Sequence, residues 1–248
     1  MHVTAYKTKK VAPHDDLFAI LVESLPADIP DNSIVAVSSK IVALCQGRVA
    51  DPTTVTKDQL VEREAELYLP RSMNKYDFSL SIKHHTFIAS GGVDESNGNG
   101  LFVLWPEDPQ RAANDIRTFL QQQYGKKHIG VIITDSKTSP LRWGVTGVAI
   151  TYSGFQLLNS YVGKPDIFGR LLKVEKVNVA DTIAAAAVGE MGEGNEQTPL
   201  AVVSDIPWVT FVDQDPTPDE LASLRIALED DMYAPLLTSV AWKKGKGK

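Results

Sequence analysis

Short strand-like and helix-like segments alternate along this chain, and no other feature limits its fold as strongly. Residues 33–37 are rich in β-branched side chains, as in a buried strand. Asp108-Pro109 combines a capping side chain with proline at the first helical position, which predicts a helix start. The longest apolar stretches, such as residues 183–188, are far too short to span a membrane. We therefore expect helices and strands in a globular chain without a membrane segment.

The remaining elements follow from apolar periodicity and from proline and glycine positions. Asp15-Asp16 precede an apolar run, which predicts a helix that ends at Pro26 and Pro30. Four glycines within residues 90–100 rule out a regular element there, so this stretch is expected to be a loop. The other expected elements are strands over 3–6, 129–134, 145–152, 171–177, 200–203 and 208–212, a strand or hairpin over 78–89, and helices over 59–69, over 179–191 and near Pro218 and Glu229.

Charge and cysteine content exclude several classes of protein. The 25 Lys and Arg against 31 Asp and Glu give a net charge of −6, which opposes binding to duplex nucleic acid but allows a single nucleotide to bind. One cysteine, Cys45, cannot form an intramolecular disulfide, so a secreted disulfide-stapled scaffold is excluded. The first ten residues lack the apolar run of a signal peptide. We expect a cytoplasmic protein that does not bind membranes.

The sequence contains no internal repeat and no low-complexity linker. Residues 1–248 are therefore expected to form a single domain, with any subdomain boundary left open. Residues 243–248 contain no apolar side chain and are expected to be a solvated, disordered basic tail. A role for this tail as a clamp on a membrane or on nucleic acid is the alternative.

Three carboxylates lie where loops are expected to leave regular structure. Asp94 is in the glycine-rich loop, Asp135 is at a strand end, and Glu193 follows a helix. Acids delivered by strand ends build the metal or nucleotide sites of many proteins, and hard carboxylate oxygens suit Mg²⁺ or Mn²⁺. Each acid alone could simply cap a turn. Taken together they predict one site, at which all three side chains converge.

Other motifs are weak or absent. The phosphate loop of ordinary nucleotide hydrolases and the nucleophile elbow of α/β-hydrolases do not occur. Gly189, Gly192 and Gly194 follow a helix instead of preceding one, so they do not form a dinucleotide fingerprint, although their backbone could wrap a phosphate. His84-His85 lie in a strand pattern, which points them to opposite faces, so they cannot share one metal. One of them could line the site, or it could be a plain strand histidine.

A series of motifs resembles one enzyme family. The motifs, in order, are Gly92-Val93-Asp94-Glu95-Ser96-Asn97, Pro106-Glu107-Asp108-Pro109, Ile116-Arg117, Val131-Ile132-Ile133-Thr134-Asp135-Ser136, Arg142-Trp143-Gly144, Asp166-Ile167-Phe168-Gly169-Arg170 and Met191-Gly192-Glu193. Together they resemble the coenzyme F420-0:L-glutamate ligases, which add glutamate to a deazaflavin cofactor. The resemblance covers about residues 33–199.

The resemblance implies a fold, an activity and an assembly. The fold would be α+β, with mixed sheets, packed helices and two intertwined subdomains. GTP, or ATP, would phosphorylate a carboxylate of the acceptor, and the amine of L-glutamate would attack the acyl phosphate. Mg²⁺ or Mn²⁺ would offset the phosphate charge, and K⁺ is a further ion that this chemistry could use. The protein would be a homodimer with the site near the subunit interface.

By motif match, the resemblance also assigns roles to individual residues. Metal ligands would be Asp94, Asp135, Ser136 and Glu193. Catalytic roles would fall to Asp94, Asp135 and Arg142. Nucleotide contacts would come from Ser39, Lys40, Asn97, Met191, Gly192, Gly194 and Asn195, and substrate contacts from Asp166 and Arg170. His84, as a histidine that could line the site, is a further candidate substrate contact.

This chain departs from the family pattern around the expected site. Leu44 stands where the family often has a nucleotide-contacting Lys, and Ser139 stands where it has an Arg. Thr8-Lys9 replaces a Leu-Pro pair expected near the nucleotide base. We therefore expect an acceptor pocket that differs from that of the deazaflavin ligases. A folate-type acceptor is one alternative. A metal-dependent nucleotide phosphohydrolase and a non-catalytic nucleotide-binding relic are alternatives from other classes.

Overall fold

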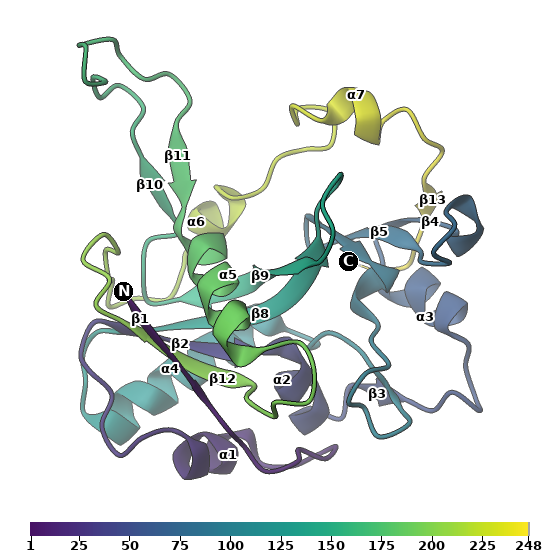
Figure 1. Cartoon of the computed structure of the whole chain (residues 1–248), viewed down its shortest axis with the longest axis horizontal. Coiled ribbons are helices and arrows are strands. Elements are labelled where there is room, and N and C mark those ends of the chain that lie inside the picture. The colour runs from purple at the N-terminus through teal and green to yellow at the C-terminus, as the bar shows by residue number, and fades with distance from the viewer. Residues whose placement is uncertain (248) are drawn as a thin grey trace.

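The computed structural model describes residues 1–247, and its central element is a five-stranded sheet of order β1-β12-β2-β8-β9 (Figure 1). Only β2 and β8 run parallel, and the other neighbouring strands are antiparallel. The first five residues of β2 are buried, because β2 lies inside the sheet with helices on both faces. The strands are β1 (His2–Tyr6), β2 (Ser33–Ser38), β8 (Ile129–Thr138), β9 (Val145–Ser153) and β12 (Leu200–Ser204).

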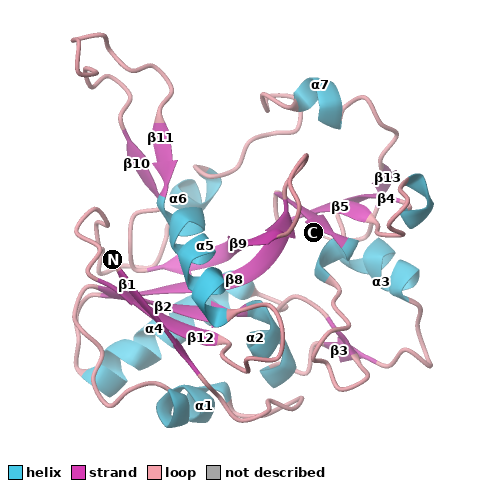
Figure 2. Cartoon of the chain, in the orientation of Figure 1, coloured by secondary structure: helices cyan, strands magenta, loops and turns pink. Residues whose placement is uncertain are grey.

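Helices cover both faces of this sheet (Figure 2). Alternate side chains of each strand point to opposite faces and pack against the helices there. Ile34 and Ala36 of β2 pack with α5, whereas Val35 and Val37 pack with α1, α2 and α4 on the other face. The α5 backbone comes so close to β9 that a Cβ on Gly147 would lie 2.2 Å from the Ala184 carbonyl oxygen. These helices are α1 (Leu17–Ser24), α2 (Ser39–Cys45), α4 (Pro109–Tyr124) and α5 (Val179–Met191).

The start and end of α4 follow directly from the sequence. The Asp108 side chain accepts a hydrogen bond from the backbone N–H of Arg111, Pro109 is the first helical residue, and Gly125 ends the helix in the left-handed conformation. The helix at 179–191 is confirmed at its predicted bounds, with Asn178 as its N-cap. Asp181 accepts the backbone N–H of Ala149 and so ties α5 to β9.

A second, four-stranded sheet has the order β13-β4-β5-β6 and lies beside α3. The predicted helix over 59–69 is wrong in its second half, because Ala65 adopts an extended conformation and the next residues pair with β5. The predicted hairpin over 78–89 is confirmed as β5 and β6. The elements are α3 (Lys57–Glu64), β4 (Leu67–Leu69), the 3-10 helix η1 (Arg71–Met73), β5 (Leu80–Lys83), β6 (Thr86–Ala89), η2 (Ser90–Gly92) and β13 (Lys243–Lys244).

The C-terminal segment, residues 243–247, packs against α3 and β4, so the prediction of a disordered tail is wrong for these residues. Lys243 and Lys244 pair with β4, and the N–H groups of Gly245 and Gly247 donate to the carbonyls of Glu66 and Ala65. A Cβ on Gly245 would lie 1.9 Å from the Ala65 carbonyl oxygen, so only glycine fits there. The segment accepts this position because it satisfies carbonyls at the end of α3. Lys248 lies outside the described residues.

A long arm, residues 161–175, projects from the body between β10 (Leu158–Ser160) and β11 (Lys176–Asn178) (Figure 1). The predicted strand over 171–177 is therefore shorter and starts later. A strand over 208–212 is replaced by a single bridge between Phe155 and Phe211, and the helix expected near Glu229 starts later. The remaining elements are β3 (Val49–Ala50), β7 (Phe102–Val103), α6 (Pro218–Ala222) and α7 (Ala234–Leu237). Among residues 1–247, no helix has the length and apolarity needed to cross a bilayer.

Candidate functional site

The first part of the site joins the glycine-rich loop to the start of α2. Lys40, the second residue of α2, forms an ion pair with Asp94, with 2.6 Å between Nζ and Oδ2. Lys40 also donates to the hydroxyl of Ser96, and Ser96 donates through its N–H and hydroxyl to Asp94. Burial acts to raise the pKa of Asp94, but the hydrogen bonds and charge of Lys40 and the bonds from Ser96 hold it below its usual value. Asp94 is therefore an ionised, well-ordered carboxylate.

The second carboxylate, Asp135, lies in β8. The sequence predicts it at the end of a strand, but β8 continues to Thr138, and the register of β8 against β9 shifts between Ile133 and Thr134, just before Asp135. The Asp135 carboxylate accepts hydrogen bonds from the Trp105 indole N–H and from the Ser136 backbone N–H. Burial raises the pKa of Asp135 to about 6, and the Asp94 charge adds to this effect. Asp135 is thus a carboxylate with too little positive charge around it.

The third carboxylate, Glu193, comes from the loop after α5. Burial raises its pKa, the Ser136 hydroxyl bonds to it and lowers the pKa, and the charges of Lys40 and Asp94 both reach it. The Asn97 side chain donates to the Gly194 carbonyl oxygen at 2.9 Å, which ties this loop to the Asp94 loop. Asp94, Asp135 and Glu193 therefore share one electrostatic environment with Lys40, Ser96 and Ser136, and that the three carboxylates act as one site stays a prediction.

The donor chemistry of this cluster fits a hard divalent cation. Its ligands would be carboxylate oxygens and the Ser136 hydroxyl, which are oxygen donors of the kind that Mg²⁺ and Mn²⁺ prefer. The raised pKa values of Asp135 and Glu193 also indicate carboxylates that a cation would stabilise in the ionised form. Within residues 1–247, no three His, Cys, Asp or Glu side chains are already drawn together tightly enough to hold a metal. Lys40 provides the positive charge beside Asp94 in this arrangement.

In the turn after α5, an internal carboxylate folds back onto the glycine backbone. Glu196 accepts the N–H of Gly194 at 2.8 Å, and a Cβ on Gly192 would lie 2.5 Å from the Glu196 carboxyl carbon. Asn195 is exposed in the same turn. The Met191 side chain does not reach the site, because it packs in the core against α5 and β12 neighbours. Ser39 is also buried, at the first turn of α2.

Several predicted residues form no ion pair or hydrogen bond with the three carboxylates within residues 1–247. Arg142 is exposed at the tip of the β8–β9 hairpin, and Arg170 is exposed on the arm. Asp166 accepts the backbone N–H groups of Phe168 and Arg170, so it shapes the arm's own turn. Leu44 is buried beside Val103, so the prediction that it removes a cation from the nucleotide site is wrong: this position faces the core.

The prediction that the two histidines lie in a strand is wrong. Lys83 pairs with Thr86, so His84 and His85 are the two turn residues of the β5–β6 hairpin, and both have positive φ (47° and 56°). The His84 ring stacks on the Trp105 indole, with 6.0 Å between centroids and 5° between planes. Burial and the Lys83 charge lower the pKa of His84. His84 therefore contacts Trp105, which in turn donates to Asp135.

Sequence reasoning missed the buried ion network next to Trp105. Glu64 binds both Arg48 and Lys83, each at 2.7 Å, and Lys83 is only 5% exposed. The available signal was the alternation of β5, which places Lys83 on the same inward face as Ser81. Trp105 itself directly precedes the Pro-Glu-Asp-Pro motif.

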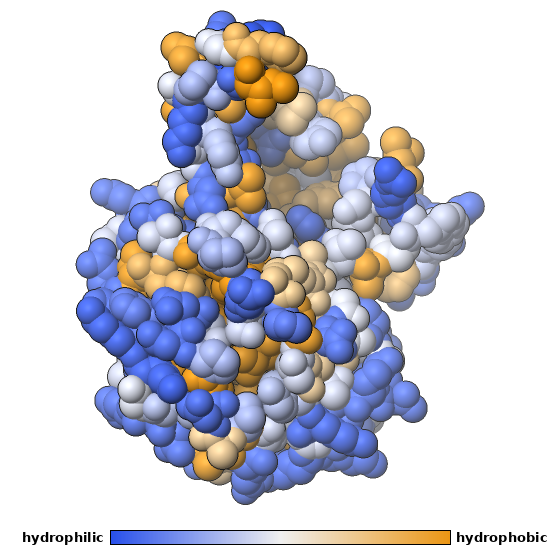
Figure 3. Space-filling model, turned by 60° about the vertical axis from the view of Figure 1, so that its left-hand side comes forward, coloured by the Kyte–Doolittle hydropathy of each residue, from blue (hydrophilic) through white to orange (hydrophobic). Residues whose placement is uncertain are grey.

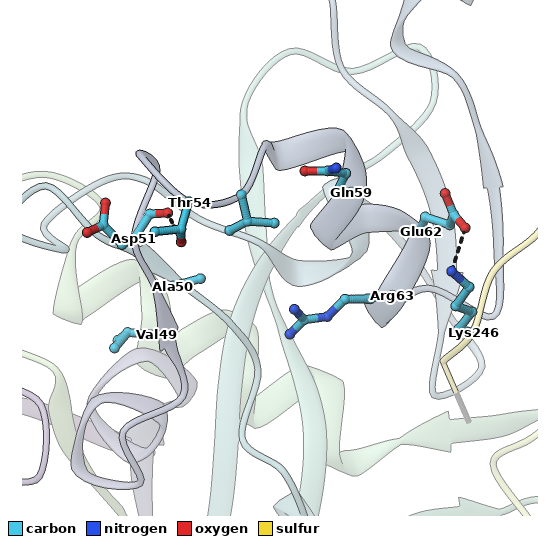
Figure 4. Close-up of a pocket in the computed structure, with 9 residues that line it drawn as sticks. Val49, Ala50, Asp51, Thr54, Gln59, Glu62, Arg63 and Lys246 are labelled. Carbon is cyan, nitrogen blue, oxygen red and sulfur yellow. Dashed lines mark hydrogen bonds and ion pairs between the residues drawn. The ribbon is translucent and has the colours of Figure 1, made fainter.

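Two cavities lie elsewhere on the described surface. One, of 740 Å³, lies between the 49–55 segment, α3 and the C-terminal segment, and Figure 4 shows the Glu62–Lys246 ion pair (2.9 Å) at its side. The other, of 370 Å³, lies at the base of the arm beside Trp208. No predicted site residue lines either cavity, so the carboxylate cluster is the better-supported functional site.

Comparison with known proteins agrees with the motif series. A model of the F420-0:gamma-glutamyl ligase family matches residues 5–205. The coenzyme F420:L-glutamate ligase of Methanopyrus kandleri is 33% identical over 213 residues, which cover 78% of this chain and 82% of the relative. The enzyme of the same name from Methanothermobacter thermautotrophicus is 31% identical over 218 residues (80% and 86%). That of Methanocaldococcus jannaschii is 33% identical over 184 residues (74% and 71%).

Proposed function

This chain belongs to the F420-0:gamma-glutamyl ligase family, and on that basis we propose that it is a nucleotide- and metal-dependent amide ligase. It adds L-glutamate in γ-glutamyl linkage to a carboxylate of coenzyme F420-0 or a related acceptor. The observation that carries the proposal is the convergence of Asp94, Asp135 and Glu193, from three distant segments, around Lys40. A turn cap explains one such acid, but not three that share one electrostatic environment.

The reaction has two steps. First, an oxygen of the acceptor carboxylate attacks the γ-phosphorus of GTP, or of ATP. The bond between the γ-phosphorus and the oxygen that bridges it to the β-phosphate breaks, which releases GDP or ADP. The product is a mixed anhydride with a good leaving group. Next, the glutamate nitrogen attacks the acyl carbon, loses a proton, and displaces inorganic phosphate to leave the amide. Both steps bring anions together, so the site must supply positive charge and orientation.

The chain's own residues divide these tasks. Asp94, Asp135, Ser136 and Glu193 would hold Mg²⁺ or Mn²⁺, which when bound offsets phosphate charge and aligns the transfer; K⁺ is a further candidate. The Lys40 ammonium is already placed beside Asp94. It would contact the nucleotide phosphates once a bound cation takes over its ion pair with Asp94. The exposed Arg142 would bind the acceptor carboxylate through charge-assisted hydrogen bonds.

The glycine turn after α5 supports nucleotide binding at the same place. Glu196 accepts the Gly194 N–H, as a phosphate oxygen would in that position. We propose that a nucleotide phosphate replaces this carboxylate, with Asn97 and Asn195 beside it. The backbone of Gly192 stays free of a Cβ that would block the approach.

The arm supports a homodimer. Ile167 and Phe168 are 91% and 89% exposed near its tip, and Leu171 and Val174 are also exposed (Figure 3, top). Apolar side chains gathered on a projecting arm are typical of an interface. In a dimer this arm would carry Asp166 and Arg170 toward a partner's substrates, which would explain why they form no ion pair or hydrogen bond with the carboxylates within residues 1–247.

One assay tests the function. Purified protein is incubated with GTP or ATP, Mg²⁺ or Mn²⁺, with and without K⁺, L-glutamate, and F420-0 or a folate as acceptor. We expect mass spectrometry to detect an acceptor heavier by one glutamyl unit, only with nucleotide and metal. Products on folate alone would support the alternative acceptor. Phosphate release without any amide would indicate a nucleotide phosphohydrolase, and neither product would indicate a binding protein without turnover.

A further inference from the structure

We infer that Trp105 is a positioning residue that fixes the Asp135 carboxylate, and that the buried Arg48–Glu64–Lys83 network holds Trp105 in place. The inference rests on the proposed function for its catalytic consequence, but its structural part concerns contacts within this chain alone. Trp105 is 1% exposed, and its indole N–H donates to Asp135 across 30 residues of sequence. It reaches the site from a position next to β7 that no predicted role includes.

The Trp105 indole is constrained on several sides. The Arg48 guanidinium donates to the Trp105 carbonyl oxygen at 3.1 Å, and the Lys83 ammonium lies 5.5 Å from the ring centroid. Both cations bind the same oxygen of Glu64, so one carboxylate fixes them together. The contacts restrain both the backbone and the ring of Trp105. A tryptophan kept only for its apolar volume would need neither cation.

Two unusual backbone positions also serve this indole. A Cβ on Gly92, which has a φ of +74°, would lie 2.6 Å from Trp105 Nε1, so glycine lets the Asp94 loop pass directly over the N–H. His84 keeps a positive φ in the two-residue turn, a conformation that side chains other than Gly, Asn and Asp adopt at a cost. Its ring lies parallel to the indole. Both positive-φ residues, Gly92 and His84, lie directly against Trp105, which is the kind of place where strained backbone is kept for a functional role.

The physical consequence is a carboxylate with one fixed orientation. Asp135 has two oxygens, of which one accepts the Ser136 N–H and the other accepts the Trp105 N–H. Without the indole N–H, the Asp135 carboxylate could rotate about its side-chain bond. Its buried negative charge would also lose the stabilisation that the N–H dipole of Trp105 provides. Partners that orient a metal-binding carboxylate from outside typically contribute 10–100-fold in metal affinity or activity.

The direct test uses indole ¹⁵N–¹H spectra of the protein labelled at its four tryptophans. Trp105→Phe identifies the Trp105 signal by its loss. We expect Asp135→Asn to move that signal upfield, because a charged acceptor is replaced by a neutral one, whereas Asp205→Asn, which removes an exposed carboxylate, leaves it unchanged. A Trp105 signal that ignores Asp135→Asn overturns the inference. This readout needs neither metal nor turnover, so it stands whether or not the proposed function does.

The functional test compares Trp105→Phe with Trp208→Phe, a matched loss of a partly exposed indole. We expect Trp105→Phe to lower Mn²⁺ affinity, measured by electron paramagnetic resonance, and kcat by about 10–100-fold, with little change in the KM for glutamate. In an Asp135→Ala background, which removes the acceptor of the indole N–H, the same substitution should add nothing to the loss of Mn²⁺ affinity. Equal effects in both backgrounds would contradict the inference. If wild-type protein binds no Mn²⁺, the metal part of the proposed function fails, and the spectra alone decide.

If Trp105→Phe does not fold, His84→Ala provides the second variant. It leaves the indole N–H and the ion network in place and removes only the stacked ring. We expect the Trp105 signal to shift and kcat to fall by less than the Trp105→Phe loss, about threefold. Unchanged spectra in this variant would show that the stack does not restrain the indole.

Discussion

The motif series predicts metal and catalytic residues in the carboxylate site and substrate residues on the arm, but the two regions are constructed in opposite ways. The carboxylates are held by partners from α2, the segment after β7, β8 and the loop after α5, so one chain defines their positions. The arm is held by its own bonds, such as that between the Asp166 N–H and the Arg170 carbonyl, and exposes its apolar tip. A motif therefore indicates which residues are candidates for function. Only the contacts in the structure indicate whether a single chain brings those residues together.

The largest effect is expected in the carboxylate site. Asp135→Asn removes the charge that would face the cation and keeps an oxygen that can accept from Trp105. Turnover should fall by more than about 100-fold, because loss of outer partners alone costs 10–100-fold. Metal titration of initial rates, with the exposed Asp205→Asn as control, measures this. Full activity at saturating Mg²⁺ would remove Asp135 from the metal site and erase the contrast between the two regions.

The arm should respond through assembly. Phe168→Asp replaces an apolar side chain that a dimer would bury twice, which corresponds to about 3 kcal/mol or about 150-fold in the dimer dissociation constant. Light scattering should show monomers at concentrations where Phe168→Leu remains dimeric. Thermal unfolding of the monomer should be nearly unchanged. A wild-type protein that is already monomeric would mean that the arm completes no second site.

The two regions should also differ in how pH affects stability. Because the folded-state pKa of Asp135 is raised to about 6, the ionised form is disfavoured in the folded protein. Stability is therefore lost as pH rises from about 4 through 6, by about 1 kcal/mol once partial exposure is allowed for. In chelator, Asp135→Asn should lose this dependence and be more stable than wild type at pH 7. Asp166→Asn, on the arm, should keep the wild-type profile in urea unfolding.

The smallest effect is expected at the hairpin tip. Ser139→Arg restores a cation next to Arg142 at an exposed position, which corresponds to about 1 kcal/mol, or about fivefold, in acceptor KM. An acceptor with a phosphodiester should gain more than one with only a carboxylate. Ser139→Gln controls for side-chain length. Efficient glutamylation of F420-0 by wild type, with folates ignored and no gain from Ser139→Arg, would contradict the expected difference in acceptor recognition.

Much of the fold could be predicted from local signals. The helix at α4 carries its own cap, proline and glycine, and α5 was predicted at its observed bounds. The error at 59–69 arose because apolar residues at Leu67 and Leu69 fit a helix and a strand equally well. Pairing with β5 decides between them, and no local pattern reports that pairing.

The acidic residues of the candidate site could be predicted from the sequence, but the residues that hold them in place could not. Asp94, Asp135 and Glu193 stand out because acids in glycine-rich or strand-end segments are rarely needed for packing. Trp105 and Lys83 do not stand out, because buried tryptophans are common and a lysine in a strand usually faces solvent. Their roles depend on Glu64, which is 19 residues from Lys83 and becomes a neighbour only through the second sheet. Met191 shows the opposite kind of error. The motif predicts a nucleotide contact there, but the Met191 side chain packs in the core.

The pairing of β13 with β4 has a consequence for local opening of the molecule. It joins segments separated by most of the chain, and it consists of a two-residue strand and a few N–H groups that donate to the end of α3. Such an edge releases its amides to exchange with solvent long before the five-stranded sheet does. Each opening leaves the last carbonyls of α3 bare, and Glu64 is the final residue of that helix. A two-residue edge strand thus influences how firmly the end of α3, and with it the buried ion network, is held.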